Sequence, residues 1–355
     1  MLHSLHIKNY RNLRDFRIET LKRVNLITGK NNTGKSSVLE AAAIYVSEGK
    51  FHRLCQILEM RGEFSAYSGI SDFEAGVESF SSLFTRGQNP FKLEISIKDT
   101  DEVTLKFARF FNDIESDKGP GHIIMREVSM DVVSEAYPSF RLGLKVKKGD
   151  EAEYISIDRI YSYKRGYERP QTPNIQYVHT GSFDENTNGK LFDNIALTEK
   201  KAFVIEALQL IEPLTEDIHF RGEEKRSAYI KLAGNAEILP VRSMGDGMNR
   251  ILTIILAIVN ASGGYFLIDE FENGLHYKVQ EKIWEIIFKL AKQLDVQVFA
   301  TTHSNDCILG FTQALNSESI EGKLMRLDNK RGEIKEVEFL SEELQIAGNQ
   351  NIEIR

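Results

Sequence analysis

The spacing of hydrophobic residues changes along the chain, and each spacing predicts a different kind of element. Near the start, apolar and polar residues alternate around 5–7 and 16–18, which predicts two short strands. The apolar run at 24–28 predicts a buried strand that Gly29 ends. From Ser36 onward, apolar residues recur at helical spacing on one face, so a helix is expected to follow that strand closely.

The middle of the chain carries another pattern. The stretch 51–90 is mixed and is predicted to be helical. Between 91 and 165, apolar residues return to every second position, as at Leu93 and Ile95, and turn residues separate the runs. This alternation predicts antiparallel strands. The Arg-Pro-Gln-Thr-Pro segment at 169–173 is the clearest linker.

In the last part of the chain, short apolar runs alternate with stretches of helical spacing. The expected elements, in order, are a helix at 197–211, a hairpin near 233–235, a helix at 247–260, a strand at 265–268, a helix at 277–292 and a strand at 296–300. Buried strands that alternate with helices are typical of a parallel sheet. We therefore expect an α/β core in two parts, 1–50 and 241–355, around an insertion at 51–240 that also forms part of a core lobe.

The segment that follows the first buried strand has the sequence of a phosphate-binding loop. Residues 29–36, called here the phosphate loop, read Gly-Lys-Asn-Asn-Thr-Gly-Lys-Ser and match GxxxxGK[ST]. Backbone N–H groups and the helix N-terminus would surround the phosphates. Lys35 is expected to reach the β- and γ-phosphates and the Ser36 hydroxyl to bind Mg²⁺. The residues expected to bind the nucleotide are Gly29, Asn31, Asn32, Thr33, Gly34, Lys35, Ser36 and Ser37. A surface turn rich in Gly and Lys is the alternative.

A second candidate element ends the predicted strand at 265–268 with Asp269 and Glu270. Carboxylates at the end of a parallel strand lie at the ligand-binding edge of the sheet. Asp269 is predicted to hold Mg²⁺, and Glu270 to orient or deprotonate the attacking water. A surface Asp-Glu pair is the alternative. The long separation between Lys35 and Asp269 disfavours compact GTPases and nucleotide kinases, and the guanine-reading NKxD pattern is missing at 329–332.

Composition restricts the class of protein further. Hydrophobic residues make up 41% and charged residues 27%, as in ordinary globular proteins. The net charge of −7 argues against a surface built for nucleic acid, although it does not exclude a local basic groove. The longest apolar run, 251–259, is shorter than the roughly 20 residues that span a bilayer, and the start has no signal-peptide pattern. Cys55 and Cys307 form no metal-site spacing. We expect a cytoplasmic protein with no membrane partner.

Two later segments complete an ordered set of motifs. Ser-Met-Gly-Asp-Gly at 243–247, called here the signature segment, precedes an apolar helix, and Phe-Ala-Thr-Thr-His-Ser at 299–304 ends an apolar strand. With these motifs, IKNYRNL near the start and IEIR at the end, the chain resembles the ABC-type ATPases of the RecF, SMC and OLD (overcoming lysogenization defect) group. It looks closest to short OLD-like ATP-binding proteins, often labelled AAA-type ATPases, that lack a fused nuclease. The resemblance implies an α/β P-loop NTPase of ABC-ATPase type, with a mixed sheet and a large α+β insertion.

The resemblance also implies roles for individual residues. Ser243, Gly245 and Gly247 would contact the γ-phosphate of ATP held by another subunit. His303 would be the switch histidine that contacts the γ-phosphate or the attacking water, so the implied catalytic set is Glu270, His303 and Lys35. The residues alone leave two alternatives open. The signature segment can be a plain helix-cap turn, and His303 can be a strand-end histidine without a catalytic role.

Three further assignments rest on the same resemblance. The segment 273–276 resembles the D-loop that crosses the dimer interface. Arg11 resembles a basic residue that approaches nucleotide phosphates in related ATPases. Gln176 is a candidate for the Q-loop glutamine by its order in the chain. If the two phosphate-binding segments lie on opposite faces, two subunits must meet around two ATP molecules, and we expect a homodimer that uses ATP and Mg²⁺.

Three functions are compatible with these features. The leading one is an ATPase that regulates a separately encoded effector, such as a nuclease, in bacterial antiphage defence or DNA maintenance. The alternatives are a RecF-like repair ATPase that binds DNA and a nucleotide sensor that does not hydrolyse ATP. The absence of heptads argues against an SMC coiled coil, and the stretch after Ser304 is too short for a Toprim nuclease domain. Asp99-Thr100-Asp101 is predicted to be a hairpin turn rather than a metal cluster.

Overall fold

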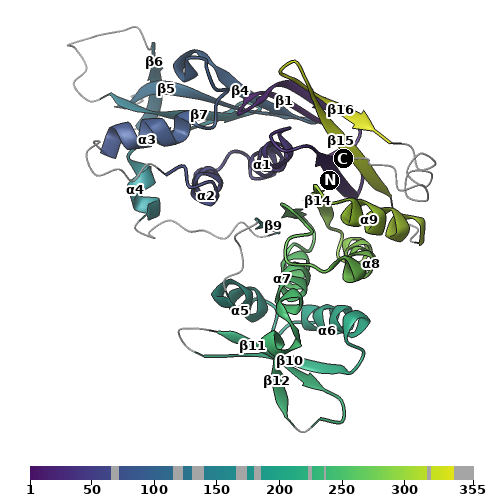
Figure 1. Ribbon diagram of the computed structural model, residues 1–355. Coiled ribbons are helices and arrows are strands. Elements are labelled where there is room, and N and C mark those ends of the chain that lie inside the picture. The colour runs from purple at the N-terminus through teal and green to yellow at the C-terminus, as the bar shows by residue number, and fades with distance from the viewer. Residues whose placement is uncertain are drawn as a thin grey trace. The chain divides into compact units, whose positions relative to one another are not determined.

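The computed structural model describes residues 1–64, 72–114, 123–129, 140–164, 174–179, 185–222, 226–235, 237–317 and 321–339 (Figure 1). The chain packs into two compact units. Unit 1 consists of Met1–Leu2, Thr20–Leu39 and Thr172–Arg355, and unit 2 consists of His3–Glu19 and Glu40–Gln171. The linker expected at 169–173 and the terminal IEIR lie outside the described residues.

This division differs from the predicted boundaries at 1–50, 51–240 and 241–355. The first strands belong to unit 2 because β1 (Leu5–Tyr10) pairs with β4 (Glu94–Lys98). The residues after 172 belong to unit 1, where β9 (Ile175–Val178) pairs with β13 (Tyr265–Ile268). Long-range strand pairing of this kind leaves no mark on local hydrophobic spacing.

Unit 1 is built on a six-stranded sheet with the order β16-β15-β3-β14-β13-β9. All of its strands are parallel except β16, which is antiparallel to β15. The remaining strands are β3 (Val24–Gly29), β14 (Gln297–Thr301), β15 (Gly322–Lys330) and β16 (Glu333–Glu338). Every residue of β3 and β14 is buried, as expected for parallel strands that are covered on both faces. The parallel sheet predicted from the sequence is confirmed.

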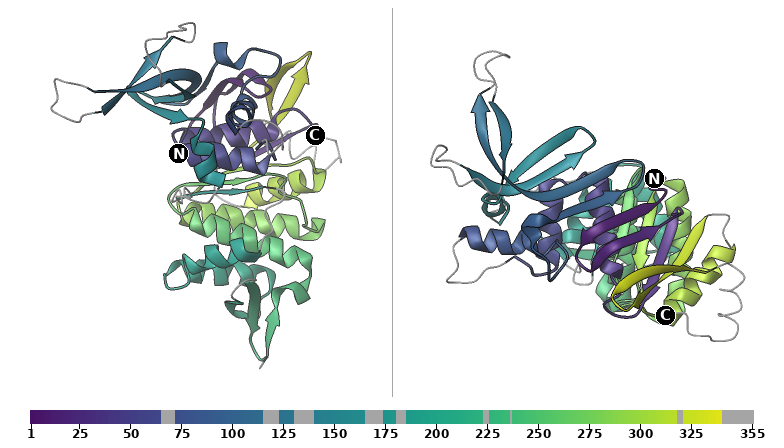
Figure 2. Two further views of the ribbon diagram at one scale, coloured as in Figure 1. Left: turned by 90° about the vertical axis from the view of Figure 1, so that its left-hand side faces the viewer. Right: turned by 90° about the horizontal axis from the view of Figure 1, so that it is seen from above.

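Helices bury one face of this sheet in a single core (Figure 2). They are α5 (Glu185–Asp193), α6 (Lys200–Ile211), α7 (Asp246–Asn260), α8 (Tyr277–Gln293) and α9 (Asn305–Ser317). Helix α1 (Lys35–Val46) follows β3, lies outside this core and continues into unit 2. Alternate strand residues such as Phe266 and Val298 belong to the same core as Trp284 of α8. The Trp284 ring also stacks on Phe271 with centroids 4.1 Å apart, which anchors the turn after β13.

A small antiparallel sheet completes unit 1. Its strands are β10 (Thr215–Arg221), β11 (Ser227–Leu232) and β12 (Ile238–Pro240), which contact α5, α6 and the 3-10 turn η3 (Val241–Met244). The turn between β11 and β12 is the hairpin predicted near 233–235.

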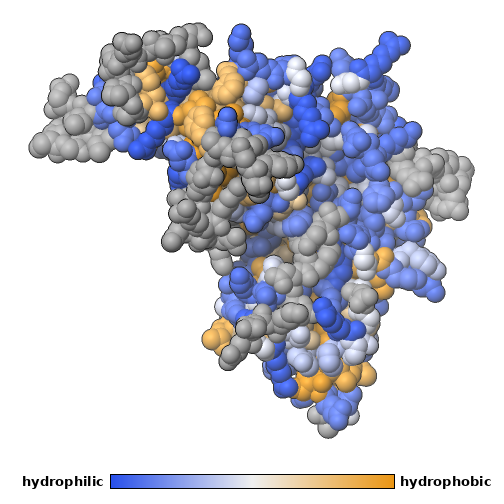
Figure 3. Space-filling view, turned by 60° about the vertical axis from the view of Figure 1, so that its left-hand side comes forward, coloured by the Kyte–Doolittle hydropathy of each residue, from blue (hydrophilic) through white to orange (hydrophobic). Residues whose placement is uncertain are grey.

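The face shown in Figure 3 is largely hydrophilic, with separate hydrophobic patches. No helix in the described ranges is both long and apolar enough to cross a bilayer.

Unit 2 is an antiparallel sheet with short helices. Its strand order is β2-β1-β4-β5-β7-β8, with β6 paired to β5. Besides β1 and β4, the strands are β2 (Leu13–Ile18), β5 (Glu102–Ile114), β6 (Ile123–Val128), β7 (Arg141–Lys148) and β8 (Glu151–Ser156). Beside the unit 2 portion of α1, the helices are α2 (Phe51–Met60), α3 (Asp72–Ser81), α4 (Arg159–Lys164) and the 3-10 turn η1 (Pro90–Lys92). The predicted antiparallel strands are confirmed, and Asp99–Asp101 forms the β4–β5 turn, where Asp99 N–H donates to the Asp101 carbonyl at 3.0 Å.

Candidate nucleotide-binding site

The sheet of unit 1 brings three motif segments to one edge. Strands β3, β14 and β13 are adjacent and parallel, so their carboxyl ends lie side by side. The phosphate loop follows β3, His303 follows β14, and Asp269 and Glu270 follow β13. Neighbouring strands are about 4.8 Å apart, which puts the phosphate loop about 10 Å from the end of β13. The structure therefore brings Lys35 and Asp269 within reach of one ligand.

The phosphate loop has the conformation of an anion nest. Gly29, Asn32 and Gly34 have φ angles of 142°, 63° and 91°. A Cβ atom on Gly29 would lie 2.6 Å from the carbonyl oxygen of Leu327, so the position accepts only glycine. The Thr33 hydroxyl donates to the Lys30 carbonyl at 2.8 Å and closes the loop. Helix α1 begins at Lys35, within the loop, so its first N–H groups lie at the loop and favour an anion.

The predicted phosphate-loop side chains differ in exposure. Asn31 and Asn32 are exposed, Thr33 and Ser37 are buried, and Ser36 is half-buried in the first turn of α1. Their proposed contacts with nucleotide stay predictions, since they depend on the bound molecule. Their placement agrees with a loop in which backbone groups form the cradle.

Lys35 lies between its own loop and the carboxylates that follow β13. Its Nζ donates to the carbonyls of Gly29 and Lys30 at 2.7 and 3.1 Å. Burial lowers the pKa of Lys35, while the negative charges of Asp269, Glu272 and Glu270 act in the opposite direction. The net lowering means that the carboxylates compensate the burial of the ammonium only in part. A phosphate oxygen bound beside Nζ would favour the charged form of Lys35 further.

The buried hydroxyl of Thr301 at the end of β14 holds both residues after β13. It donates a short hydrogen bond to Asp269 Oδ1 and accepts the Glu270 N–H at 2.9 Å. Glu270 has a φ of 49°, a left-handed conformation that costs a residue with a side chain about 1–2 kcal/mol. A strained backbone that a neighbouring strand maintains in this way is typical of functional sites.

Glu272 contacts the segment after β14 with both carboxylate oxygens. Oε1 accepts the His303 N–H at 2.8 Å and lies 3.0 Å from His303 Nδ1. Oε2 accepts the Thr302 hydroxyl at 2.8 Å. The Glu272 side chain is 12% exposed, whereas the His303 side chain is 49% exposed. His303 is therefore held from one side and open to solvent on the other.

A buried arginine of α7 contacts the turn after β13. Arg250 Nη2 donates to the Glu270 carbonyl at 3.3 Å. Burial lowers the pKa of Arg250 to about 10, against the effect of the nearby Glu272, Glu270 and Asp269 carboxylates. Because α7 begins at the signature segment, this contact connects that segment to the predicted catalytic turn within one chain.

The signature segment leads into α7 without capping it by a side chain. Ser243 is exposed, and its hydroxyl donates to the Pro240 carbonyl at 2.6 Å. Gly245, with a φ of 100°, is the N-cap residue of α7. Gly247 lies in the first helical turn, where an added Cβ would be 3.4 Å from the Gly274 carbonyl of the predicted D-loop. Ser243 is thus not the cap of α7, and the helix N-terminus lies beside an exposed hydroxyl.

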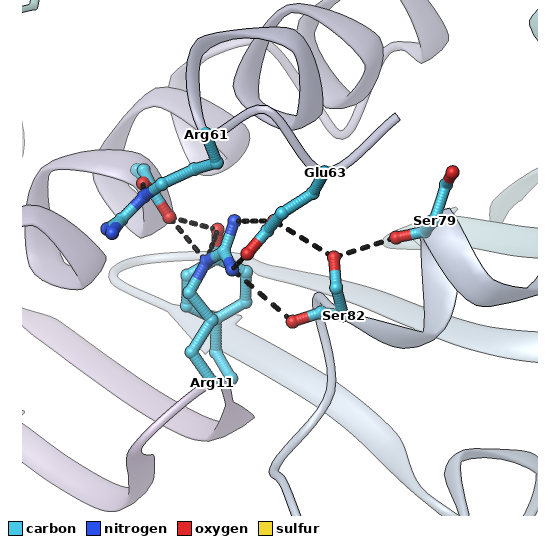
Figure 4. A network of polar contacts seen from close by, with 7 residues as sticks. Arg11, Arg61, Glu63, Ser79 and Ser82 are labelled. Atoms are coloured by element: carbon cyan, nitrogen blue, oxygen red, sulfur yellow. Dashed lines mark hydrogen bonds and ion pairs between the residues drawn. The ribbon is translucent and has the colours of Figure 1, made fainter. Parts of the chain in front are cut away.

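Two predicted residues lie in other surroundings. Arg11 belongs to unit 2, where its Nε donates to Glu40 at 2.6 Å and its Nη atoms to Glu63 at 2.8 and 2.9 Å (Figure 4). Its contact with nucleotide stays a prediction, and in this structure its guanidinium is engaged by these carboxylates. Gln176 lies within β9 opposite Phe266, rather than beyond the carboxyl end of the strand.

The donor set suits magnesium. Mg²⁺ in nucleotide sites usually takes one or two protein oxygens, with phosphates and water as the other ligands. The Ser36 hydroxyl and the Asp269 carboxylate are oxygen donors at the same sheet edge. Both residues therefore fit the role predicted for them.

Sequence reasoning missed Thr301, Glu272 and Arg250. Each lies next to a motif recognised in the sequence, but its role becomes apparent only from the fold. Thr301 directly precedes the Thr-His pair, Glu272 follows the Asp-Glu pair closely, and Arg250 borders the apolar run of α7. Their roles depend on the pairing of β13 with β14 and on the packing of α7.

Comparisons with known proteins agree with this geometry. The profile of a family described as "AAA domain, putative AbiEii toxin, Type IV TA system" matches residues 24–306. An "ATP/GTP phosphatase" of Helicobacter pylori is 26% identical over 339 residues, which cover 87% of this chain and 86% of that protein. The "DNA replication and repair protein RecF" of Rickettsia typhi is 28% identical over 90 residues, which are 25% of each chain.

A solved structure shows the same fold. It is an "Smc head domain with an extended coiled coil bound to the C-terminal domain of ScpA derived from Pyrococcus furiosus". It matches with a TM-score of 0.51 and 13% identity over 99% of each chain. The predicted α/β P-loop NTPase fold of ABC-ATPase type is therefore confirmed.

Proposed function

Because this chain belongs to that AAA-domain family and has the fold of the ABC-type ATPases of the RecF and SMC group, we propose that it binds ATP at the carboxyl edge of the unit 1 sheet and hydrolyses it. The observation that carries the proposal is the meeting of the phosphate loop, Asp269, Glu270 and His303 at that edge. The Helicobacter pylori relative named an ATP/GTP phosphatase supports the same reaction.

Each residue has a distinct part in the proposed reaction. The amides of the phosphate loop and the Lys35 ammonium bind the phosphates. Ser36 and Asp269 would hold Mg²⁺, which neutralises charge on the phosphate oxygens. Glu270, held by Thr301, orients the attacking water and accepts its proton. His303 contacts the γ-phosphate or the attacking water.

The proposal includes a dimer that closes around ATP. Its support is the signature segment, where Ser243 and Gly245 are exposed and directly precede α7. The N–H groups of a helix N-terminus favour an anion. In the closed dimer this segment would contact the γ-phosphate held by the partner subunit, so hydrolysis would release the contact.

Substituting Glu270→Gln tests closure, since it should slow hydrolysis and leave binding intact. With ATP and Mg²⁺, gel filtration of this variant should show a dimer that is absent without nucleotide. The same oligomer in both conditions would contradict closure driven by nucleotide.

The finer proposal concerns what the ATPase acts on. We propose a separately encoded effector, for which a nuclease in antiphage defence or DNA maintenance is the leading candidate, as in the OLD-like proteins that the chain resembles. The matched SMC head, which is bound to ScpA, supports the general arrangement of an ATPase with a separate partner. ATPase assays with and without DNA test the alternatives. Salt-dependent stimulation by DNA would favour a RecF-like role, and no turnover in any condition would favour a nucleotide sensor.

A further inference from the structure

The small antiparallel sheet of unit 1 has one buried face and one accessible face. Ile218, Ile230 and Leu239 come from its three strands, are paired across the sheet and pack on the hydrophobic core. Side chains alternate along a strand, so the neighbouring residues of each strand lie on the opposite face, called here the outer face. The sheet lies beyond α5 and α6 at one end of unit 1, as Figure 1 shows.

A row of three ring side chains crosses the outer face. His219 of β10 is paired with Tyr229 of β11, which is paired with Pro240 of β12. Side chains directly opposite each other in this way have Cβ atoms about 4.5–5.5 Å apart, so each ring lies beside the next. The His219 side chain is 45% exposed, Pro240 is exposed and Tyr229 is half-buried. The row therefore offers ring surfaces to a ligand.

A cation lies beside this row. Arg221 is exposed, and its guanidinium carbon lies 5.4 Å from the centroid of the Tyr229 ring. It forms no ion pair with any residue that the structure describes, whereas the carboxylates of Glu216 and Asp217 are each paired with a lysine at 2.7 Å. The positive charge of Arg221 is therefore available to an anionic group of a ligand that covers the rings.

We propose that the outer face of the β10–β12 sheet binds a single-stranded nucleic acid, whose bases stack on the ring row and whose phosphates contact Arg221. Sheet surfaces bind single strands by stacking bases on aromatic rings and on guanidinium planes. Each unit of such a strand carries a planar base and an anionic phosphate, so it uses both features of the face. A duplex keeps its bases stacked inside and can use only the arginine. The inference goes beyond ATP hydrolysis and does not depend on it.

Fluorescence anisotropy with labelled oligonucleotides tests the inference on the full chain without ATP. The probes are a 20-nucleotide oligo-dT, a 20-nucleotide oligo-U and a duplex of 20 base pairs. We expect a Kd for at least one single strand that is tenfold or more below that of the duplex, and the tighter of the two single strands identifies DNA or RNA. Equal or tighter binding of the duplex, or no binding of either single strand, would overturn the inference.

Two substitutions separate the ring row from the cation. Tyr229→Val removes the ring, keeps a residue that favours strands, and should raise the Kd for the single strand by about tenfold or more, while Tyr229→Phe should bind nearly as the native protein. Arg221→Ala should reduce the slope of log Kd against log salt concentration by about 0.7, the value of one phosphate contact on a single strand. A native Kd in Tyr229→Val, or a native salt slope in Arg221→Ala, would contradict the assigned contacts.

A matched ring and a second ligand complete the test. Phe73→Leu removes a ring of α3 that is 46% exposed in unit 2, and should leave the Kd for the single strand unchanged. Equal losses in Phe73→Leu and Tyr229→Val would show that binding is not localised on the outer face. Decaproline probes the other kind of ligand that ring-lined surfaces bind. If it bound in a manner that depends on Tyr229 and the oligonucleotides did not, the face would be a protein-binding surface and the inference would be wrong.

Discussion

Helix α1 contributes one residue to each of two charged clusters, and the two clusters differ in how their charges are paired. In unit 1, the first turn of α1 supplies Lys35, which bonds the carbonyls of its own loop. In unit 2, the next turn supplies Glu40, whose two oxygens pair with Arg11 and Arg61. The Tyr10 hydroxyl also donates to Glu40 at 2.8 Å.

The pKa shifts of the two cations differ accordingly. Burial lowers the pKa of Lys35 despite the carboxylates nearby. Burial also acts to lower the pKa of Arg11, but the negative charges of Glu40 and Glu63 and the hydrogen bonds to Glu63 outweigh it and raise that pKa. The unit 2 cluster is thus paired internally, whereas in unit 1 the effect of burial on Lys35 exceeds that of the carboxylates near it. We infer that the first stabilises the fold and the second binds the substrate.

The largest effect on stability should come from opening the unit 2 cluster. Glu40 is 1% exposed, so Glu40→Ala leaves Arg11 buried with part of its charge uncompensated. We expect a loss of about 3–5 kcal/mol in the free energy of unfolding, measured by urea denaturation with circular dichroism. Glu48→Ala is the matched control in unit 2, because Glu48 pairs with Lys148 at the surface, and should cost under about 1 kcal/mol. Equal losses for the two variants would remove the distinction between the clusters.

The largest effect on binding should come from the unit 1 cluster. Lys35→Met removes the cation that the phosphates need and should weaken ATP binding or turnover by about a hundredfold or more, measured by calorimetry and phosphate release. The free energy of unfolding should hardly fall, because burial of this ammonium already opposes folding. Lys282→Ala, an exposed cation of α8, is the control and should bind ATP normally. Normal ATP binding by Lys35→Met would refute the assignment of the phosphate loop.

A smaller effect should follow from the loss of one hydroxyl. Thr301→Val keeps the shape of the side chain but releases Asp269 and the backbone of Glu270. We expect kcat to fall by about tenfold to a hundredfold. Thr312→Val is the control, because that buried hydroxyl bonds the Ile308 carbonyl of its own helix. Native kcat in Thr301→Val would mean that the turn after β13 needs no support from β14.

The smallest effect concerns alkaline pH. Because burial lowers the folded-state pKa of Lys35 below its ordinary value of 10.5, the unfolded chain binds more protons between those two pKa values. The stability of the native protein relative to Lys35→Met should therefore rise as the pH increases through that window. Denaturation of both proteins at several alkaline pH values measures this difference. A relative stability that falls with pH would show that the pKa of Lys35 is raised.

Local sequence predicted the helices and strands better than the strand pairings and side-chain contacts between them. The strand at 24–28 and the helix from Ser36 follow from apolar spacing, and the phosphate loop between them follows from its glycines and helix N-terminus. The partners of Arg11 could not be predicted in this way, because Glu63 follows α2 and reaches Arg11 only in the folded unit. For the same reason Thr301 became meaningful only once β13 and β14 were seen to be neighbours.

The proposed reaction requires the phosphate loop and the turn after β13 to bind one magnesium-bound triphosphate together. A crystal structure of Glu270→Gln grown with ATP and Mg²⁺ would show whether they do. We expect a triphosphate bound by the loop amides and Lys35, with the metal ion between Ser36 and Asp269. Nucleotide bound away from this edge, or a metal ion without Asp269 in its coordination or water shell, would refute the shared site.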